Sequence, residues 1–258
     1  MIKFSGIFIF LIIFLVATCP HSLALSSGPE DEAAVKDNAS SGKEVEPEEV
    51  EWEEISEEKT VPDPLEPWNR LVFTFNDRLY FWVMKPAAQG YNAVIPEVVR
   101  ISVQNFFDNL SMPVRFVSSV LQAKLKSAGI ELARFGVNSV FGIAGLFDIA
   151  KSYNLEPQER DLGLTFGFYG IGEGLYIVWP FWGPSSLRDS VGSVGDGFLS
   201  PTNYITPAED SLAVNGYSYF NNISLHTGEY EDLKESAIDP YIAVKDSYIQ
   251  HRRYLIKK

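Results

Sequence analysis

The sequence predicts an all-α domain, because apolar residues recur every three or four positions along most of the chain after residue 62. Prolines begin or precede several of these periodic stretches, as they do in the first turn of many helices. No long stretch alternates apolar and polar residues in the way a half-buried strand does. One short hairpin near Tyr169 to Ile177 is the exception that we expect. The sequence has no internal repeat, so we expect a single helical domain over residues 63–258.

The N-terminus has the features of an export signal, which we place at residues 1–24. Lys3 precedes an apolar run from Ile7 to Ala17 that is too short to span a bilayer. Val16-Ala17-Thr18-Cys19 resembles a lipoprotein cleavage site, and cleavage before Cys19 would leave it as the lipidated first residue. Ser22-Leu23-Ala24 instead fits the small-x-small rule of ordinary signal peptidase, which would remove Cys19. Both alternatives export the chain, and its single cysteine excludes an internal disulfide.

Acidic residues gather in the segment 25–62, which we expect to be a disordered tether. Between Leu25 and Glu66 the chain has 15 acidic residues against three lysines, a balance of −12 out of a net charge of −13. The segment is rich in Glu, Ser and Ala and has no apolar period, so it lacks the apolar surface needed to fold. The rest of the chain is nearly neutral, which excludes a basic groove for nucleic acid.

Three helices are expected before residue 136. Their apolar periods occupy residues 67–85, 97–110 and 113–135, and each begins at or directly after a proline. The first should end before Pro86, because a proline disfavours helical backbone in the residue that precedes it. A strongly apolar run from Val140 to Ala150 follows the third helix, with Asp148 as its only charge.

The stretch from Phe166 to Gly183 combines glycines with aromatic residues, and its only charge is Glu173. A membrane-spanning helix needs about 20 apolar residues that satisfy their own backbone, and five glycines and Pro180 argue against such a helix here. Trp and Tyr favour the boundary between hydrocarbon and water. We therefore predict that this stretch touches lipid without spanning a membrane.

Three further helices are expected after this stretch. The first starts near Ser186. Thr206 to Glu209 has the pattern of a capping box, which predicts a helix from about Leu212 to His226 that ends at Gly228. Asp239-Pro240 begins the last helix, whose final turns contain several cations that suit a helix C-terminus.

The sequence offers little for catalysis. It contains no His-Glu-x-x-His zinc helix, no paired cysteines and no Gly-x-Ser-x-Gly nucleophile elbow. We therefore expect no enzyme activity, no metal site and no cofactor. Asp148, Asp189 and Asp196 could form an acid pair, but Asp189 beside Arg188 more simply forms a salt bridge or a helix cap.

Several phrases stand in order along the chain: Asp63 to Arg70, Asn105 to Leu110, Arg134-Phe135, Gly145 to Asp148, Gly167 to Tyr176, Pro180 to Asp189 and Asp239 to Tyr241. Together they resemble the MlaA (VacJ) family, outer-membrane lipoproteins of the system that maintains lipid asymmetry in Gram-negative envelopes. The resemblance covers about Asp63 to Leu255.

This resemblance implies a ring-like bundle of amphipathic helices that lies in the inner leaflet of the outer membrane, on its periplasmic face. A channel through the ring would let phospholipids misplaced in the outer leaflet pass down to a soluble periplasmic carrier. The resemblance also implies association with a trimeric porin. The glycine-rich phrase and the adjoining loop from Asn154 to Asp161 would belong to the channel.

Candidate residues follow from the resemblance and from the physical need of a moving phospholipid for a polar path bordered by apolar helix faces. The lipid-path candidates are Gly167, Gly170, Gly172, Gly174, Tyr176, Asp148 and Asp189. The membrane-facing candidates are Trp68, Phe73, Phe75, Trp82, Trp179 and Trp182. Cys19 is the lipidation site if the lipoprotein alternative holds.

The sequence departs from the family pattern in four places. Leu175 stands where the family commonly has Pro, and Ala123 stands where Gly is usual. Ala144 replaces one glycine of the pair before Leu146. These three changes bear on local backbone geometry. Thr18 stands where lipoprotein signals prefer Gly or Ala, and it bears on whether Cys19 is lipidated.

Two functions of other classes remain as alternatives. A periplasmic hydrolase would act on lipid or cell wall, and turnover of phospholipid that depends on Asp148 or Asp189 would favour it. An envelope adaptor would bind a porin without moving lipid, and unchanged outer-leaflet phospholipid in a knockout would favour the adaptor.

Overall fold

The structure is a computed structural model that describes residues 62–258, which lie in the second of two compact units, Ile55–Lys258. The expectations for the export signal at residues 1–24, for Cys19 and for the acidic tether up to residue 61 lie outside the described residues. The remaining expectations concern the helical unit.

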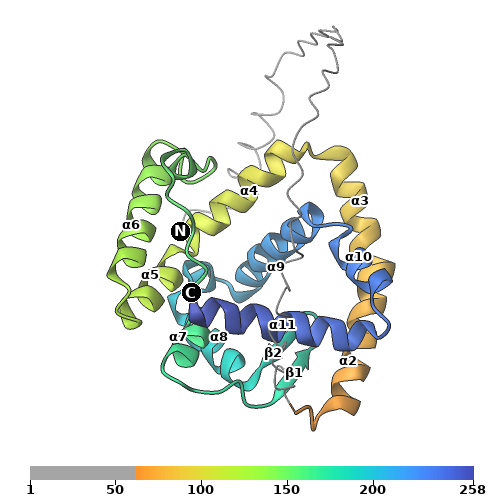
Figure 1. Cartoon of the computed structure of the whole chain (residues 1–258). Helices are drawn as coiled ribbons and strands as arrows, with labels where there is room; N and C mark the ends of the chain where they lie inside the picture. Colours follow the sequence, from red (N-terminus) through yellow and green to blue (C-terminus); the bar gives the residue numbers. More distant parts are fainter. Residues whose placement is uncertain (1–61) are drawn as a thin grey trace, which may run out of the picture. The chain divides into compact units, whose positions relative to one another are not determined.

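The helices of this unit follow one another around a ring (Figure 1). One side is formed by α2 (Glu66–Leu79) and α3 (Lys85–Val94), the next by α4 (Glu97–Leu110), and the opposite side by α5 (Met112–Leu121) and α6 (Leu125–Val140). The remaining side is formed by α7 (Leu162–Phe168), α8 (Leu187–Leu199), α11 (Pro240–Lys257) and a hairpin of β1 (Tyr176–Trp179) and β2 (Gly183–Ser186). The predicted all-α fold with one short hairpin is confirmed.

Two further helices complete the unit. α9 (Ala208–Leu225) packs against α3 and α4, and α10 (Glu229–Ser236) packs against α11. Short 3-10 turns occupy Ala150–Tyr153 and Pro201–Tyr204. Within residues 62–258, no helix has both the length and the apolar content to cross a bilayer.

The first predicted helix does not end at Pro86. α2 passes directly into a π-helical turn at Tyr80–Met84, in which the Lys85 N–H donates to the Tyr80 carbonyl. α3 then begins with Pro86 in its first turn, where a missing N–H is tolerated. The prediction was wrong because the change of helix type resets the hydrogen-bond register just before the proline.

The third predicted helix divides into α5 and α6. The break lies at Ala123, whose φ of 54° is in the left-handed region, and the Ala123 N–H donates to the Val120 carbonyl. Left-handed backbone at the end of a helix is the usual place for glycine. The break between the two helices was not predicted, because alanine is a strong helix former and gives no sign of a helix end.

The hairpin lies further along the chain than predicted. β1 and β2 pair antiparallel with Trp179 opposite Gly183, so the turn is formed by residues 180–182. The segment 169–175 stays outside the strand, with Gly170 and Gly174 in left-handed backbone. The prediction of a hairpin was right, and its position was wrong.

Two asparagine side chains of helix α2 make hydrogen bonds to backbone groups of β1 and the hairpin turn, as a neighbouring strand would. Asn69 Nδ2 donates to the Tyr176 carbonyl at 3.0 Å, and the Val178 N–H donates to Asn69 Oδ1 at 2.9 Å. Two turns later, Asn76 Nδ2 donates to the Trp179 carbonyl at 3.0 Å and its Oδ1 accepts from the Phe181 N–H at 2.9 Å. The amides of one helix face thus satisfy backbone groups that a third strand would otherwise pair.

Helix starts match the capping chemistry at two of the three predicted places. Ser186 caps α8 by accepting from the Asp189 N–H, and Asp239 caps α11 by accepting from the Tyr241 and Ile242 N–H groups. The predicted capping box at Thr206 is wrong. Pro207 itself is the N-cap residue of α9, without a capping hydrogen bond from a side chain, so Thr206 stands one residue too early.

A small hydrophobic core joins α2, β1 and α11. It consists of Val72, Tyr176, Val178, Tyr241 and Ile249, with Phe73, Ile242 and Tyr248 packed against it. This core holds the hairpin and the last helix to the first one, so that elements far apart in the sequence close the ring.

Candidate functional site

The interior of the unit is rich in polar side chains. The buried polar and charged residues are Asn69, Arg100, Asn109, Ser118, Ser119, Gln122, Glu131, Arg134, Asn138, Arg160, Thr165, Ser186, Arg188, Asp189, Thr202, Asn221, Ser224 and Lys245. They outnumber the buried hydrophobic residues, and Glu131, Asn69 and Asn221 are entirely inaccessible to solvent. Polar groups are costly to bury without partners, so an ordinary soluble domain keeps most of them outside.

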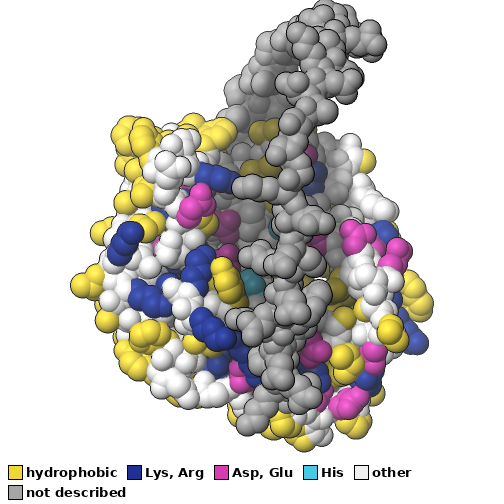
Figure 2. Space-filling view, viewed as in Figure 1, with side chains coloured by type: hydrophobic (Ala, Val, Ile, Leu, Met, Phe, Trp, Pro, Cys, Tyr) yellow, Lys and Arg dark blue, Asp and Glu magenta, His cyan; other side chains and the backbone are white. Residues whose placement is uncertain are grey.

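The exterior carries large hydrophobic side chains in unusual number. Trp82, Val140, Trp182 and Phe198 are each more than 70% exposed. Figure 2 shows hydrophobic side chains along the perimeter over α5 and α6, with charged side chains gathered inside this edge. Exposed apolar surface of this extent marks contact with a membrane or another protein. The unit is therefore apolar at its perimeter and polar within.

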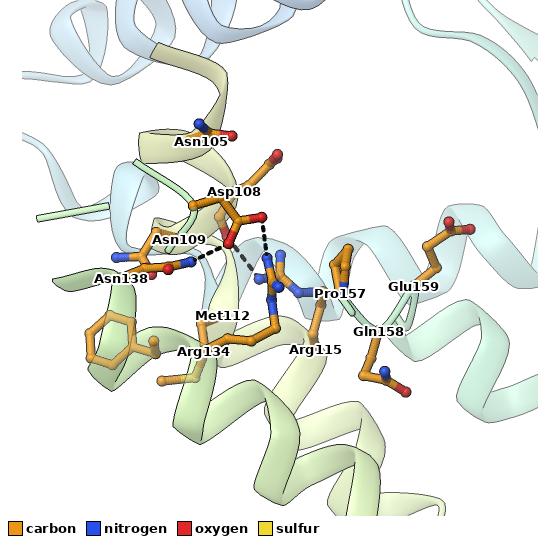
Figure 3. A pocket seen from close by; sticks show the side chains of 12 residues that line it. Asn105, Asp108, Asn109, Met112, Arg115, Arg134, Asn138, Pro157, Gln158 and Glu159 are labelled. Carbon is orange, nitrogen blue, oxygen red and sulfur yellow. Dashed lines mark hydrogen bonds and ion pairs between the residues drawn. The ribbon is translucent and has the colours of Figure 1, made fainter. Parts of the chain in front are cut away.

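A pocket of about 260 Å³ opens into this polar interior (Figure 3). Helices α4, α5 and α6 and the loops around Asp148 and Pro157 supply its walls. The lining residues are Asn105, Asp108, Asn109, Met112, Arg115, Arg134, Phe135, Asn138, Asp148, Pro157, Gln158 and Glu159. The pocket thus combines both signs of charge with amides and a few apolar groups.

Asp148 is fixed at the pocket wall by two residues of α6. Arg134 Nη2 and Asn138 Nδ2 each donate to the Asp148 carboxylate at 2.9 Å. Asn138 Oδ1 in turn accepts from the Ala150 N–H at 2.8 Å, which anchors the loop after α6. Burial opposes ionisation of Asp148, but the hydrogen bonds from Arg134 and Asn138 outweigh it and hold its pKa below the ordinary value.

Asp108 has a different environment in the same pocket. Burial raises the pKa of its carboxyl, against the hydrogen bond from Gln104 and the positive charge of Arg115. Arg115 itself pairs with Glu131 at 2.8 Å and donates to the Asp108 carbonyl at 2.8 Å. The pocket wall therefore contains arginines that are neutralised by carboxylates, and one carboxyl group that lacks an ion-pair partner within residues 62–258.

Asp189 lies in a buried charge network rather than in this pocket. Its carboxylate accepts from Arg188 Nε at 3.0 Å, Arg252 Nη2 at 2.8 Å and the Tyr248 hydroxyl at 2.7 Å. Arg252 also binds Asp161, so the network joins α11 to the starts of α7 and α8. The predicted salt bridge between Asp189 and Arg188 is present. The cations of the last helix do more than complement its dipole, because Arg252 is one of the central groups of this network.

The three carboxylates do not form the acid pair that the sequence left open as an alternative to the salt bridge at Asp189. Asp148 and Asp189 each have cationic partners of their own. Asp196 accepts from the Leu162 N–H at 3.1 Å, and burial together with the nearby charge of Asp161 raises its pKa to about 6. In the part of the chain that the structure describes, no group of His, Cys, Asp and Glu side chains is arranged to hold a metal ion.

The glycine candidates occupy the segment between α7 and β1, apart from Gly167 within α7. A Cβ on Gly167 would meet the Ile256 side chain at 2.4 Å, so this glycine allows α7 to approach α11 closely. A Cβ on Gly172 would meet nothing within 4 Å, and its φ is not in the left-handed region. Exposed apolar side chains at Phe168, Tyr169, Ile171 and Leu175 surround these glycines. Arg253 Nε binds Glu173 at 3.0 Å and ties the segment to α11.

Two of the candidates lie in or against the hydrophobic core. Tyr176 is 1% exposed within the core, so its side chain is not available to a passing lipid. Phe73 is half-buried and packs edge-to-face on Tyr241, whereas Trp68, Phe75, Trp82, Trp179 and Trp182 are exposed. Phe75 meets Phe181 at the hairpin turn with ring centroids 5.4 Å apart. The structure therefore groups Phe75 with the hairpin aromatics, separates Phe73 from them, and places Tyr176 in the hydrophobic core.

Several buried polar residues that shape the interior were not among the predicted site residues. They include Asn69, Gln122, Glu131, Arg134 and Arg160. One pattern could have indicated some of them: Glu131, Arg134 and Asn138 recur at helical spacing on α6, which predicts a polar helix face beside the apolar one. The partners of Arg160 and Gln122 come from distant segments and leave no local pattern.

Comparison with known proteins places these features in a family. The profile described as MlaA lipoprotein matches residues 61–255. The Intermembrane phospholipid transport system lipoprotein MlaA of Escherichia coli K12 is 29% identical over 199 residues, which cover 75% of this chain and 78% of that protein. The protein of the same name from Haemophilus influenzae is 30% identical over 202 residues, covering 75% of this chain and 79% of that one.

A solved structure agrees with the sequence comparisons. It comes from work on the structural basis for maintenance of bacterial outer membrane lipid asymmetry, has a TM-score of 0.65 and 29% identity, and is matched over 76% of this chain and 100% of its own. An uncharacterized protein of Rickettsia felis is 32% identical over 190 residues, covering 72% of this chain and 75% of that protein. By profile, sequence and fold, the chain belongs to the MlaA lipoprotein family.

Proposed function

We propose that this protein acts in intermembrane phospholipid transport at the outer membrane. It lies at the periplasmic face, takes phospholipids that are mislocalised in the outer leaflet, and passes them through a polar path to a soluble periplasmic carrier, which maintains lipid asymmetry. A trimeric porin holds it in place. The names of the relatives from Escherichia coli and Haemophilus influenzae support the transport system.

The single observation that supports this proposal best is the distribution of polarity. A phospholipid that leaves a leaflet must keep its headgroup in a polar environment and its acyl chains in an apolar one. The unit has a polar interior, with a charged pocket, and an apolar exterior that includes the exposed side chains of Trp82, Trp182 and Phe198. The perimeter suits insertion into one leaflet, because the backbone of an amphipathic helix is satisfied internally and its apolar face is buried in lipid.

The carboxylates that a hydrolase would need are already engaged. Asp148 and Asp189 are held in ion pairs with Arg134, Arg188 and Arg252. Both hydrogen-bond networks favour the ionised, charge-neutralised carboxylate, so neither group is poised as a proton donor. This environment supports transport over the alternative of a hydrolase.

The glycine-rich segment 167–174 borders the path in this proposal. A Gly172→Trp variant places a large side chain where the backbone accepts it, because Gly172 has open space and no left-handed φ. Gly174→Trp is a poorer probe, since Gly174 has a φ of 68° and any side chain there strains the backbone. Gly136→Trp is the matched control, because Gly136 is also exposed and open but lies on α6.

Outer-leaflet phospholipid in a strain that lacks this protein tests the proposal. The wild-type chain and Gly136→Trp should restore a low level of outer-leaflet phospholipid and resistance to detergent. Gly172→Trp should fractionate with the membrane and fail to restore either. If the wild-type chain leaves outer-leaflet phospholipid unchanged while it still binds the porin, it is an adaptor and the transport proposal is wrong.

A further inference from the structure

Lys124 lies in the turn between α5 and α6, and Arg160, from the segment before α7, contacts the end of α5 at Gln122. Arg160 is only 8% exposed, and its Nη1 donates to Gln122 Oε1 at 2.8 Å. Its Nε is shut off from solvent and has no hydrogen-bond partner. Lys124 Nζ lies 5.1 Å from the centre of the Phe168 ring. Within residues 62–258, neither cation has a carboxylate in ion-pair distance.

Other arginines of the interior have more hydrogen-bond acceptors than Arg160 has. Arg134 and Arg188 each face a carboxylate, and Arg252 faces two. Arg100 donates to backbone carbonyls, including that of Ser224 at 2.8 Å. The acidic neighbours of Arg160 in the sequence turn elsewhere: Glu159 toward His251, and Asp161 toward Arg252. The positive charge of Arg160 therefore stays uncompensated.

The two cations also act on each other. Burial lowers the pKa of Lys124, and the positive charge of Arg160 lowers it further. Burial likewise lowers the pKa of Arg160. Two like charges close together, one buried and one partly exposed, destabilise the fold unless an anion accompanies them. Gln122, which is 3% exposed and also donates to Thr165 Oγ1 at 3.1 Å, keeps the guanidinium in this position.

We propose that Lys124 and Arg160 form a binding site for a phosphate group. The Arg160 Nη2 has no partner within the described residues and can donate to a phosphate oxygen, while the ammonium of Lys124 supplies a second positive charge. The rings of Phe168 and Tyr169 have centroids 5.3 Å apart, Phe168 contacts Lys124, and both rings are exposed. A phospholipid offers a phosphate next to apolar groups, so its phosphodiester is the ligand expected if the proposed transport function holds.

Binding of short-chain lipids to the purified full-length protein tests this site. Isothermal titration in a detergent without phosphate would compare dihexanoyl phosphatidylethanolamine, dihexanoylglycerol and inorganic phosphate. Lys124→Gln and Arg160→Gln should each weaken binding of the phospholipid about tenfold, as expected for the loss of one charge-assisted contact. Lys126→Gln is the matched control, because Lys126 is an exposed cation two residues further along, and it should bind as the wild type does.

The arms of the experiment distinguish the sources of the phosphate. Binding of the phospholipid alone, weakened in both variants, assigns the site to a lipid headgroup, and equal binding of inorganic phosphate assigns it to free phosphate. The Lys124 ammonium makes no hydrogen bond within residues 62–258, and the backbone bonds of Lys124 do not depend on its side chain, so its variant should fold even if Arg160→Gln does not. Unchanged affinity of Lys124→Gln for both phosphate compounds would overturn the site. That result leaves transport intact, because transport is measured separately as outer-leaflet phospholipid.

Discussion

Asp189 shows at the scale of one residue how the polar interior is held together. Burial alone would raise the pKa of its carboxyl, but the hydrogen bonds from Arg252 and Arg188 outweigh burial and lower the pKa to about 2. The folded state therefore binds a proton at Asp189 less readily than the unfolded state, where the pKa is about 3.9. The stability from this group is complete above about pH 4 and is lost as the pH falls toward 2.

An Asp189→Asn variant should be less stable than the wild type at pH 7. The expected loss is on the order of 3 kcal/mol, because Arg188 would be left buried without a carboxylate. The difference should shrink as the pH falls from about 4 to 2, since the wild-type carboxylate is then protonated as well. Denaturant unfolding at pH 7, 4 and 2.5 measures this. A difference that stays constant over this range would contradict the ionic role of Asp189.

Ala123 and Ala144 are strained at the same scale. Their φ angles are 54° and 56°, a region that costs about 1–2 kcal/mol for a residue with a Cβ. Both stand where the family resemblance leads us to expect glycine. The family resemblance marks these two positions as unusual for alanine. Their positive φ angles are the physical reason that glycine suits them.

Replacing either alanine by glycine should stabilise the protein by up to about 1 kcal/mol, because relief of the strain exceeds the entropy that glycine adds to the unfolded chain. Ala133→Gly is the control. Ala133 is exposed within helix α6, so its replacement should destabilise by about 1 kcal/mol. Thermal or denaturant unfolding of the three variants gives the comparison. Equal destabilisation by all three would show that the left-handed positions carry no strain.

At the scale of elements, Asn69 and Asn76 make helix α2 a substitute for a strand. Asn69 is entirely buried and satisfies both the Tyr176 carbonyl and the Val178 N–H. Asn76 does the same for Trp179 and Phe181 at an exposed position. This arrangement explains how a hairpin of two short strands is stable at the edge of a helical unit.

Asn69→Ala should destabilise the protein by about 2–3 kcal/mol, because it leaves a buried carbonyl and a buried N–H unpaired. Asn76→Ala should cost less, since water can replace its exposed hydrogen bonds. Amide hydrogen exchange localises each effect: Asn69→Ala should speed exchange at Val178, and Asn76→Ala should speed it at Phe181. Exchange at Val178 that is equally slow in the wild type and Asn69→Ala would rule out the substitution of helix for strand.

The elements also show what the sequence could predict. Apolar spacing and the caps at Ser186 and Asp239 predicted most helices, because these signals are local. The predictions failed where a local signal was missing or misleading. The break at Ala123 lacks the glycine that usually marks it, and the π turn before Pro86 lets a helix continue past a proline.

Across the whole molecule, neighbouring aromatic residues divide between buried and outward-facing positions. Phe73 and Phe75 are two positions apart on α2, so they point to different faces of the helix, one toward Tyr241 and one outward. Tyr176 and Trp179 lie on opposite faces of β1, with Tyr176 buried and Trp179 exposed. Periodicity would have separated the first pair. Separating the second pair requires the correct position of the strand, and the hairpin was predicted too early in the chain.

The buried ion pairs of the whole unit could not be predicted. Arg252 is 63 residues from Asp189 and 91 from Asp161 along the chain. No spacing rule links such positions, so the sequence indicates a polar interior through the family resemblance and not through these ion pairs.

The apolar perimeter should lie in the bilayer. We expect strong quenching of tryptophan emission in variants that retain only Trp82 or only Trp182, in vesicles of lipids brominated on their acyl chains. These side chains are 75% and 73% exposed and should therefore meet the acyl chains. Trp179, whose Nε1 donates to Ser190 Oγ at 2.9 Å, should be quenched less. Emission from Trp82 and Trp182 that is unaffected by brominated lipid would place the perimeter in water.

The transport proposal requires that phospholipid pass through this protein from the outer membrane to a soluble carrier. A direct test follows radiolabelled phospholipid from vesicles that contain the trimeric porin, with and without this protein, to the purified periplasmic carrier. Label should reach the carrier only when the protein is present, and Gly172→Trp should block this transfer while Gly136→Trp does not. Equal transfer with and without the protein would show that phospholipid does not pass through it.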